Sequence, residues 1–173
     1  MAGSLIKIDE EIVSSAVASV TLTGIDSTYD VYKLVIEDVV PTSDNDSFRL
    51  RVTKSGTEDS TSNYDYAFKN LRTDTSFSNS SGTNGDYYQL AGGLGNATGE
   101  AYNDKLHLFN FANSSEYSFA TTEGVLTNHN TSLFGGQGGF VHTVASASDG
   151  VKVYFNSGNI DTGSRFVLYG LKK

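Results

Sequence analysis

The sequence contains no cysteine and no tryptophan, and its one proline is Pro41. Without cysteine the chain can form neither a disulfide framework nor a thiolate metal site. A single proline, placed among turn-forming residues, leaves the hydrogen-bonded ladders of extended segments unbroken. Long apolar runs are also missing, since none approaches the ~20 residues of a membrane-spanning helix. The composition typical of helices, rich in Ala, Glu, Lys, Leu and Arg, is also absent. These absences exclude a helical bundle, a coiled coil and a membrane-spanning helix.

Basic residues are few: 12 Lys and Arg stand against 20 Asp and Glu, which gives a formal net charge of −8. The densest basic pair is Arg49 with Arg51. A nucleic-acid-binding surface needs a cluster of basic side chains to neutralise phosphates, and an anionic membrane attracts the same kind of cluster. We therefore expect no nucleic-acid partner and no membrane insertion. No basic stretch followed by an apolar stretch opens the chain, so no signal peptide is visible.

Alternation of apolar and polar residues recurs along the 173 residues. In the clearest segment Phe48, Leu50 and Val52 alternate with polar neighbours, as in a strand with one buried face. Further strands are expected at 5–8, 12–22, 32–37, 105–109, 117–120, 151–156 and 165–169, and weaker candidates at 64–71, 86–90, 124–128 and 139–144. Turn-forming residues separate them. Many short strands of this kind predict an all-β fold, an antiparallel β-sandwich formed as one domain over residues 1–173.

Two kinds of segment break this pattern. Residues 73–85 are polar, with Phe77 as their one large apolar residue, and we expect a long exposed loop there, the kind of segment that often carries function. Residues 91–99 and 135–139 are rich in glycine. They are interpreted as bulges or close backbone approaches, with a backbone-shaped binding loop as the alternative.

The sequence carries no local motif for catalysis or metal binding. It has no Gly-x-Ser-x-Gly motif, and its glycine-rich segments lack the Lys-Ser/Thr ending of a phosphate-binding loop. The histidines, His107, His129 and His142, lack the spacing of metal ligands. The acidic turn at 44–49 begins like a calcium loop but lacks the glycine and the glutamate that complete one. We expect no catalytic residue, no metal and no cofactor. A hydrolase acting through two carboxylates stays an alternative, because sequence cannot select the pair.

Tyrosines in polar, turn-rich sequence suggest carbohydrate binding, since sugar sites combine exposed aromatic faces with polar groups. The candidate ligand-binding residues are Asp86, Tyr87, Tyr88 and Gln89, and Tyr64, Tyr66 and Tyr102 lie in similar surroundings. The alternative is that these tyrosines pack at the sandwich edges or at subunit contacts. The absence of tryptophan argues against a dedicated lectin.

Two segments carry a family resemblance. Residues 20–34 include the turn Gly-Ile-Asp-Ser-Thr-Tyr-Asp, and residues 153–163 end in Ser-Gly-Asn-Ile-Asp-Thr-Gly before the Leu-Tyr-Gly-Leu-Lys of 168–172. Together they resemble small β-rich proteins of marine tailed bacteriophages that are labelled as tail-fibre or other virion proteins. The likeness runs from about residue 5 to residue 172, although 57–99 matches no pattern of that group. It implies a jelly-roll-like virion domain without enzymatic activity, and it supplies no catalytic residues.

This resemblance sets the functional expectation. The chain would be a structural accessory protein of a phage particle, either a capsid decoration or a fibre-like protein, that assembles in the host cytoplasm and ends in the virion. Its partners would be other virion proteins and identical copies, in a homo-oligomer that analogy makes a trimer. Residues 1–23 would form an N-terminal assembly segment whose strands pair with a neighbouring edge. The alternatives are a host-recognition adhesin that binds surface glycan and a tail-associated hydrolase.

Overall fold

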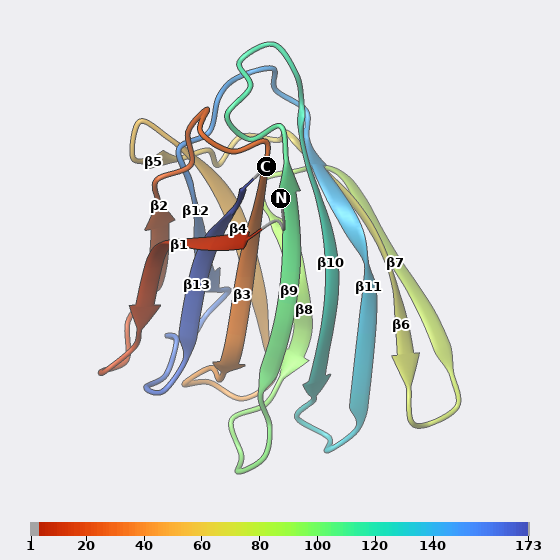
Figure 1. The fold of residues 1–173 in the computed structure, drawn as a ribbon. Coiled ribbons are helices and arrows are strands. Elements are labelled where there is room, and N and C mark those ends of the chain that lie inside the picture. Colours follow the sequence, from red (N-terminus) through yellow and green to blue (C-terminus); the bar gives the residue numbers. More distant parts are fainter. Residues whose placement is uncertain (1–3, 173) are drawn as a thin grey trace.

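The computed structural model describes residues 4–172, which form two antiparallel β-sheets packed face to face (Figure 1). These residues contain no helix, and therefore no helix long and apolar enough to cross a membrane. The predicted all-β sandwich is therefore confirmed.

The larger sheet has eight strands. Their spatial order is β1 (Ser4–Ile12), β13 (Arg165–Lys172), β3 (Val31–Val39), β9 (Tyr102–Phe109), β10 (Ser118–Thr127), β11 (Leu133–His142), β6 (Tyr64–Arg72) and β7 (Phe77–Gly85). The smaller sheet has the order β2 (Ser19–Thr23), β12 (Gly150–Phe155) and β4 (Asp46–Lys54). The far edge of β4 pairs with β8 (Tyr88–Leu94) and with the two-residue β5 (Thr57–Glu58).

The topology is that of a jelly roll. The order β1-β13-β3-β9 lies over the order β2-β12-β4-β8. Successive members of this set alternate between the two sheets, except β4 and β8, which pair with each other in the smaller sheet. Two hairpins interrupt the roll: β6–β7 is inserted between β4 and β8, and β10–β11 between β9 and β12. Both hairpins extend only the larger sheet. That sheet consequently projects beyond the edge of the smaller one (Figure 1).

The core lies between the sheets and is formed by alternate residues of each strand. In β4, Phe48, Leu50 and Val52 are fully buried, as their alternation predicts. They pack with side chains of the larger sheet that are equally buried, including Leu34, Ile36, Leu106, Leu108, Phe166 and Leu168. Burying these apolar side chains supplies the main free energy that holds the sheets together.

The expectation of one strand over residues 12–22 is wrong. Strand β1 ends at Ile12 and β2 begins at Ser19. Between them the chain crosses from the larger to the smaller sheet, held by a backbone hydrogen bond from the N–H of Val13 to the Ser164 carbonyl (2.9 Å). Apolar spacing on both sides of this crossover keeps the same parity, so the alternation alone did not show it.

The expected exposed loop at 73–85 is also wrong, because β7 occupies Phe77–Gly85. It pairs with β6 along one side and is the outer strand of the larger sheet. Neither of its faces is well covered, and Phe77 itself is 65% exposed. A strand without a buried face needs no apolar alternation, which is why its sequence resembles a loop.

Two glycines of the segment 135–139 mark close backbone approaches. Gly138 and Gly139 lie within β11, where an added Cβ would come within 2.3 Å of the Ala67 carbonyl oxygen and 2.4 Å of the Ala120 carbonyl oxygen respectively. In the other segment Gly93 and Gly99 have positive φ angles of 71° and 88°, a conformation that favours glycine.

The N-terminal segment pairs within its own chain. Strand β1 pairs with β13 and β2 pairs with β12, each at the edge of a sheet. Pairing of this segment with a neighbouring subunit stays a prediction, and residues 1–3 of the segment lie outside the described residues.

Candidate functional site

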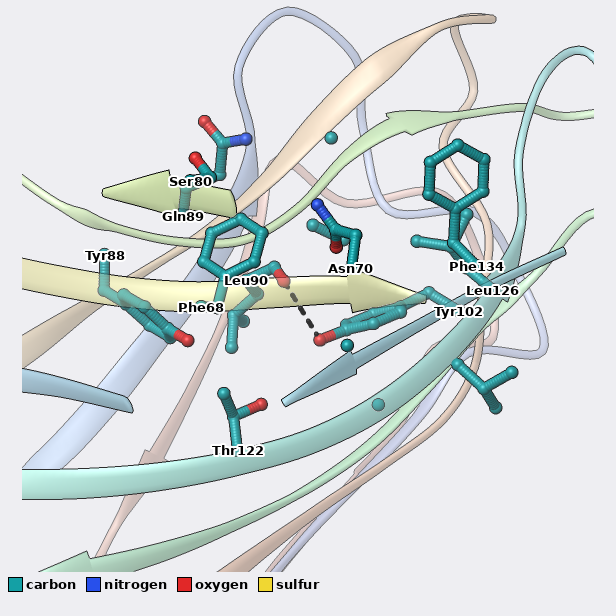
Figure 2. A pocket seen from close by; sticks show the side chains of 15 residues that line it. Phe68, Asn70, Ser80, Tyr88, Gln89, Leu90, Tyr102, Thr122, Leu126 and Phe134 are labelled. Atoms are coloured by element: carbon teal, nitrogen blue, oxygen red, sulfur yellow. Dashed lines mark hydrogen bonds between the residues drawn. The ribbon is translucent and has the colours of Figure 1, made fainter. Parts of the chain in front are cut away.

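A pocket lies between the sheets where the larger sheet projects past β8 (Figure 2). We name it the inter-sheet pocket. Its volume is about 150 Å³. Side chains and backbone from six strands line it: Phe68, Asn70, Ser80, Tyr88, Gln89, Leu90, Ala91, Gly92, Tyr102, Thr122, Gly124, Val125, Leu126, Phe134 and Gly136.

Aromatic rings form much of the pocket wall. Phe68 and Phe134 are partly exposed, on the inner faces of the neighbouring strands β6 and β11. Phe68 stacks on Tyr66 with ring centroids 5.8 Å apart, and the guanidinium of Arg72 lies 4.4 Å from the centroid of Phe134. These contacts fix the orientation of the two phenyl rings.

Two glycines of the larger sheet leave room inside the pocket. At Gly124 an added Cβ would lie 3.0 Å from atoms of Asp104 and Tyr102, so the glycine allows these side chains to pack beneath it. At Gly136 an added Cβ would meet only Asn70 Oδ1, at 3.8 Å, within a 4 Å radius. The space beside Gly136 is therefore open, and the missing side chain is what keeps it open.

A buried carboxylate organises the polar base of the pocket. Asp104 is 5% exposed and accepts hydrogen bonds from Thr122 Oγ1 (2.5 Å), the Tyr102 hydroxyl, and the backbone N–H groups of Lys105 (2.6 Å) and Glu123 (3.1 Å). Burial raises the pKa of Asp104, although these hydrogen bonds oppose the shift. Because its oxygens are occupied by the protein's own donors, Asp104 acts to position the Tyr102 and Thr122 hydroxyls.

The hydroxyl of Tyr88 is the exception among these groups. The Tyr88 side chain is fully buried and stacks on Phe140 with centroids 4.4 Å apart. Its hydroxyl faces the side where Thr122 and the Tyr102 hydroxyl lie (Figure 2). It makes no hydrogen bond of good geometry among residues 4–172, although the Thr122 hydroxyl lies close enough to act on it. Burial and the nearby charge of Asp104 raise the pKa of Tyr88 well above its ordinary value, with Thr122 opposing the shift, so the group stays a hydroxyl. An unpaired buried hydroxyl costs about 1–3 kcal/mol.

The structure separates the four residues that the sequence predicts as a ligand-binding group, Asp86, Tyr87, Tyr88 and Gln89. Tyr88 and Gln89 line the inter-sheet pocket, whereas Asp86 and Tyr87 are not among its lining residues. The expectation of exposed rings is wrong for Tyr88, which offers the pocket its hydroxyl. Tyr87 is partly exposed and its ring lies beneath the guanidinium of Arg49, 3.9 Å from the ring centroid.

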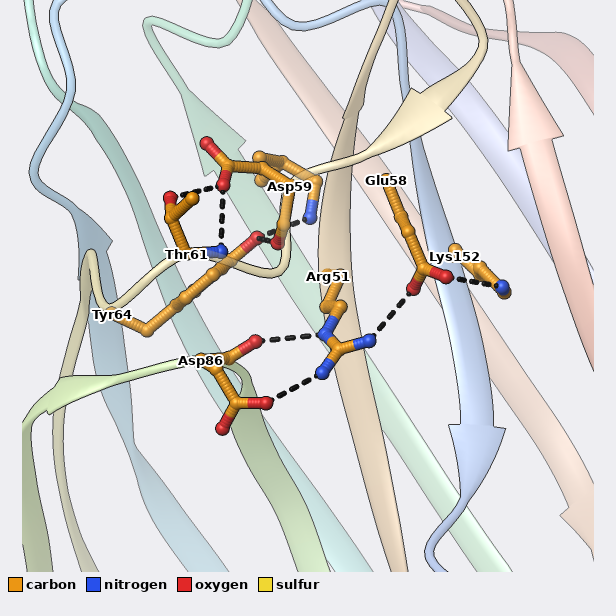
Figure 3. A network of polar contacts seen from close by, with 8 residues as sticks. Arg51, Glu58, Asp59, Thr61, Tyr64, Asp86 and Lys152 are labelled. Atoms are coloured by element: carbon orange, nitrogen blue, oxygen red, sulfur yellow. Dashed lines mark hydrogen bonds and ion pairs between the residues drawn. The ribbon is translucent and has the colours of Figure 1, made fainter.

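Asp86 belongs to an ion-pair network on β4 and its neighbours (Figure 3). Arg51 donates from Nη2 to Asp86 Oδ2 (2.6 Å) and from Nε to the Asp86 carbonyl oxygen (2.8 Å). The same guanidinium donates to Glu58 (3.0 Å), which also accepts from Lys152 (2.8 Å). This network attaches the turn between β7 and β8 to β4. It positions β8, and with it one wall of the pocket.

The histidines do not form a joint site. His107 faces outward on β9, while His142 is fully buried on the inner face of β11 with its Nε2 3.0 Å from Asp59 Oδ2. Burial lowers the pKa of His142, with Asp59 opposing the shift. Within residues 4–172 no group of three or more His, Asp or Glu side chains gathers at metal-binding distance.

A second feature lies on the outer face of the larger sheet. Phe119 is directly opposite Phe109 on one side and Val141 on the other, and the two phenyl groups are 44% and 37% exposed. With Ala67 and the backbone of Gly139 they border a shallow groove of about 450 Å³. We call this the outer apolar groove. Such contiguous exposed apolar surface is typical of association sites.

Comparison with known proteins leaves the family open. No protein family and no curated protein matches the chain. Among solved structures, a fructofuranosidase from Schwanniomyces occidentalis in complex with fructosylnystose matches 98% of this chain at 9% identity, with a TM-score of 0.28. The chain spans about a third of that protein, 34% of its length. A likeness this low carries no argument about function.

Proposed function

We propose that this protein is a non-enzymatic structural protein of a bacteriophage particle, a capsid decoration or fibre-like accessory protein that associates through its larger sheet. The outer apolar groove carries the proposal. Phe109 and Phe119 are exposed side by side on the outer face of that sheet. Fully burying an exposed side chain of this kind contributes roughly 1.5–3 kcal/mol. Phe109 and Phe119 still expose 37% and 44% of their surface, so covering both by a subunit or by the particle surface gains part of that amount and favours association.

The free edges of the larger sheet support the same function. Strand β7 is a nine-residue outer strand, FSNSSGTNG, without proline or a charged residue to block pairing. An unblocked edge accepts further strands from identical or different chains. Strand β1, the outer strand at the opposite edge, carries four charged residues and a register shift at 7–9, so it is the better protected of the two edges. A homo-oligomer, in the trimeric form that the phage resemblance implies, would use these edges together with the groove.

The fold and composition agree with this proposal. Jelly rolls occur in viral capsid proteins and in lectins. A chain without cysteine folds in the reducing cytoplasm of a host cell without needing disulfides. The resemblance to phage virion proteins supports a location in the particle.

Counting copies in purified particles tests the proposal. Gel densitometry should find hundreds of copies per particle if the protein decorates a capsid, and few if it belongs to a tail fibre. The double variant Phe109→Ser, Phe119→Ser should fold normally and fail to enter particles. The matched control Leu71→Ser, Leu133→Ser changes two equally exposed residues on the same sheet and should be incorporated normally. A product found free in lysate and missing from particles would refute the proposal.

One observation favours a second candidate function, recognition of host glycan by an adhesin. The inter-sheet pocket combines aromatic walls with amide and hydroxyl groups, the composition typical of sugar sites. A hydrolase has no such support, because the buried carboxylate beside the pocket, Asp104, already accepts four hydrogen bonds from the protein.

A further inference from the structure

We infer that the inter-sheet pocket binds one neutral sugar ring, either a monosaccharide or the terminal unit of a glycan. The inference concerns the pocket alone. It holds whether or not the chain belongs to a phage particle, because it rests on the groups that line the cavity.

The unpaired hydroxyl of Tyr88 is the first argument. Buried polar groups in native proteins nearly always have a hydrogen-bond partner, so an orphaned one indicates a missing water or ligand. Tyr88 is fully buried, and its hydroxyl makes no hydrogen bond of good geometry among the described residues, with only the Thr122 hydroxyl close enough to offer a weak one. The Tyr102 hydroxyl and Thr122 lie on the same side of the pocket and are held there by Asp104 (Figure 2). A hydroxylated ligand would give Tyr88 the partner it lacks.

The lining of the pocket is the second argument. The flat rings of Phe68 and Phe134 suit the apolar C–H face of a sugar ring, and the side chains of Asn70, Gln89 and Ser80 supply donors and acceptors near its hydroxyls. The amide nitrogen of Asn70 already donates to Ser78 (3.3 Å). Its Oδ1 atom lies toward the open space beside Gly136.

Charge and size define the ligand further. None of the residues that line the pocket carries a charged side chain. The nearby carboxylate of Asp104 would repel an anionic sugar. The volume of about 150 Å³ is half the roughly 300 Å³ at which pockets begin to hold drug-sized molecules. A single neutral ring fits these limits, and the remainder of a longer glycan would extend outside the pocket.

Adjacent glycines of β11 provide a matched pair of variants. Gly136 faces the pocket, where a Cβ meets only Asn70 at 3.8 Å, and Gly135 faces outward, where a Cβ meets only Leu71 at 3.9 Å. Neither has a positive φ angle. Valine suits a strand at both positions, so both variants should fold. Gly136→Val fills the pocket, whereas Gly135→Val leaves it unchanged.

The experiment titrates isotope-labelled protein with free glucose, galactose, mannose, fucose and N-acetylglucosamine, and follows amide NMR shifts. We expect at least one sugar to shift the amide signals of Gly124 and Gly136 with millimolar affinity. Gly136→Val should abolish the shifts and Gly135→Val should retain them. Tyr88→Phe should weaken binding about fivefold, as expected for the loss of one hydrogen bond of about 1 kcal/mol.

Three outcomes would overturn the inference. The first is that no sugar shifts the pocket amides of the wild-type protein, which would assign the partner of Tyr88 to water. The second is binding that Gly136→Val retains, which would place the sugar elsewhere. The third is binding of phenol, used as an apolar ring probe, in the pocket without binding of any sugar. Because purified protein suffices, these results are independent of incorporation into particles.

Discussion

Two single variants, Tyr102→Phe and Tyr88→Phe, should affect the stability of the protein differently: the first should lower it and the second should not. The Tyr102 hydroxyl donates to the buried carboxylate of Asp104 and also lies 3.3 Å from the Leu90 carbonyl oxygen. A hydrogen bond to a charged group is worth roughly 1.5–3 kcal/mol. Tyr102→Phe leaves Asp104 buried with one donor fewer, and we expect it to lower the free energy of unfolding by about 2 kcal/mol.

Tyr88→Phe removes a hydroxyl that makes no hydrogen bond of good geometry among the described residues. The ring and its stacking on Phe140, with centroids 4.4 Å apart, are retained. Because a buried polar group without a partner is unfavourable, its removal should leave the free energy of unfolding unchanged or raise it by about 1 kcal/mol.

Urea unfolding followed by far-ultraviolet circular dichroism measures both variants, since the chain has no tryptophan to report by fluorescence. Their m-values should equal that of the wild type, so the midpoints compare stabilities directly. The reasoning is refuted if Tyr88→Phe loses as much stability as Tyr102→Phe. That result would mean the Tyr88 hydroxyl is already satisfied, for instance by an ordered water.

Three further predictions concern the fold. Burial lowers the pKa of His142 below its usual 6.5. Desolvation by burial raises the pKa of Asp59, but hydrogen bonds from Thr61, Lys54 and His142 outweigh it and bring the pKa below its usual 3.8. Both groups therefore contribute stability at neutral pH that is lost as pH falls. In His142→Gln, urea midpoints measured at several pH values should decline less just below pH 6.5, and an unchanged decline would contradict the assignment. Gly138→Ala places a Cβ against the backbone of the neighbouring strand and should lower the stability of the protein by about 1–3 kcal/mol. A lower melting temperature measures this loss, and the control Gly136→Ala should leave the melting temperature unchanged. Equal losses of stability in the two variants would argue against the close approach at Gly138. Arg51→Met removes hydrogen bonds to two carboxylate residues and should lower the urea-derived stability by about 1–2 kcal/mol; an unaltered midpoint would show that the network adds nothing.

Strands with one buried face were predictable from the sequence, because burial imposes alternation. Phe48, Leu50 and Val52 are the clearest example, and all three are fully buried. Strand β7 was not predictable, since an outer strand with two exposed faces has no such constraint. Strands β6, β10 and β11 of the inserted hairpins have the same kind of sequence as strands of the roll, so alternation could not show that they belong to the larger sheet alone.

The candidate site was only partly predictable. Tyr88 and Gln89 were predicted to bind a ligand and do line the pocket. Asp86 was predicted with them but instead pairs with Arg51. Adjacent residues of an extended segment point to opposite faces, so four consecutive residues could not all face one ligand. A usable signal was present at Asp104, which shares its parity with the buried Leu106. A carboxylate at a core position indicates a polar cluster that must be satisfied internally.

The inter-sheet pocket is formed mainly by the two inserted hairpins. Nine of its fifteen lining residues come from β6, β7, β10 and β11, which lie outside the eight strands of the roll, while β8 and β9 supply the other six. Substitutions on these hairpins can therefore alter the shape and polarity of the cavity without disturbing the central packing between the sheets. Related proteins could therefore differ in the shape and polarity of this pocket through changes in the two hairpins while they keep the same jelly roll.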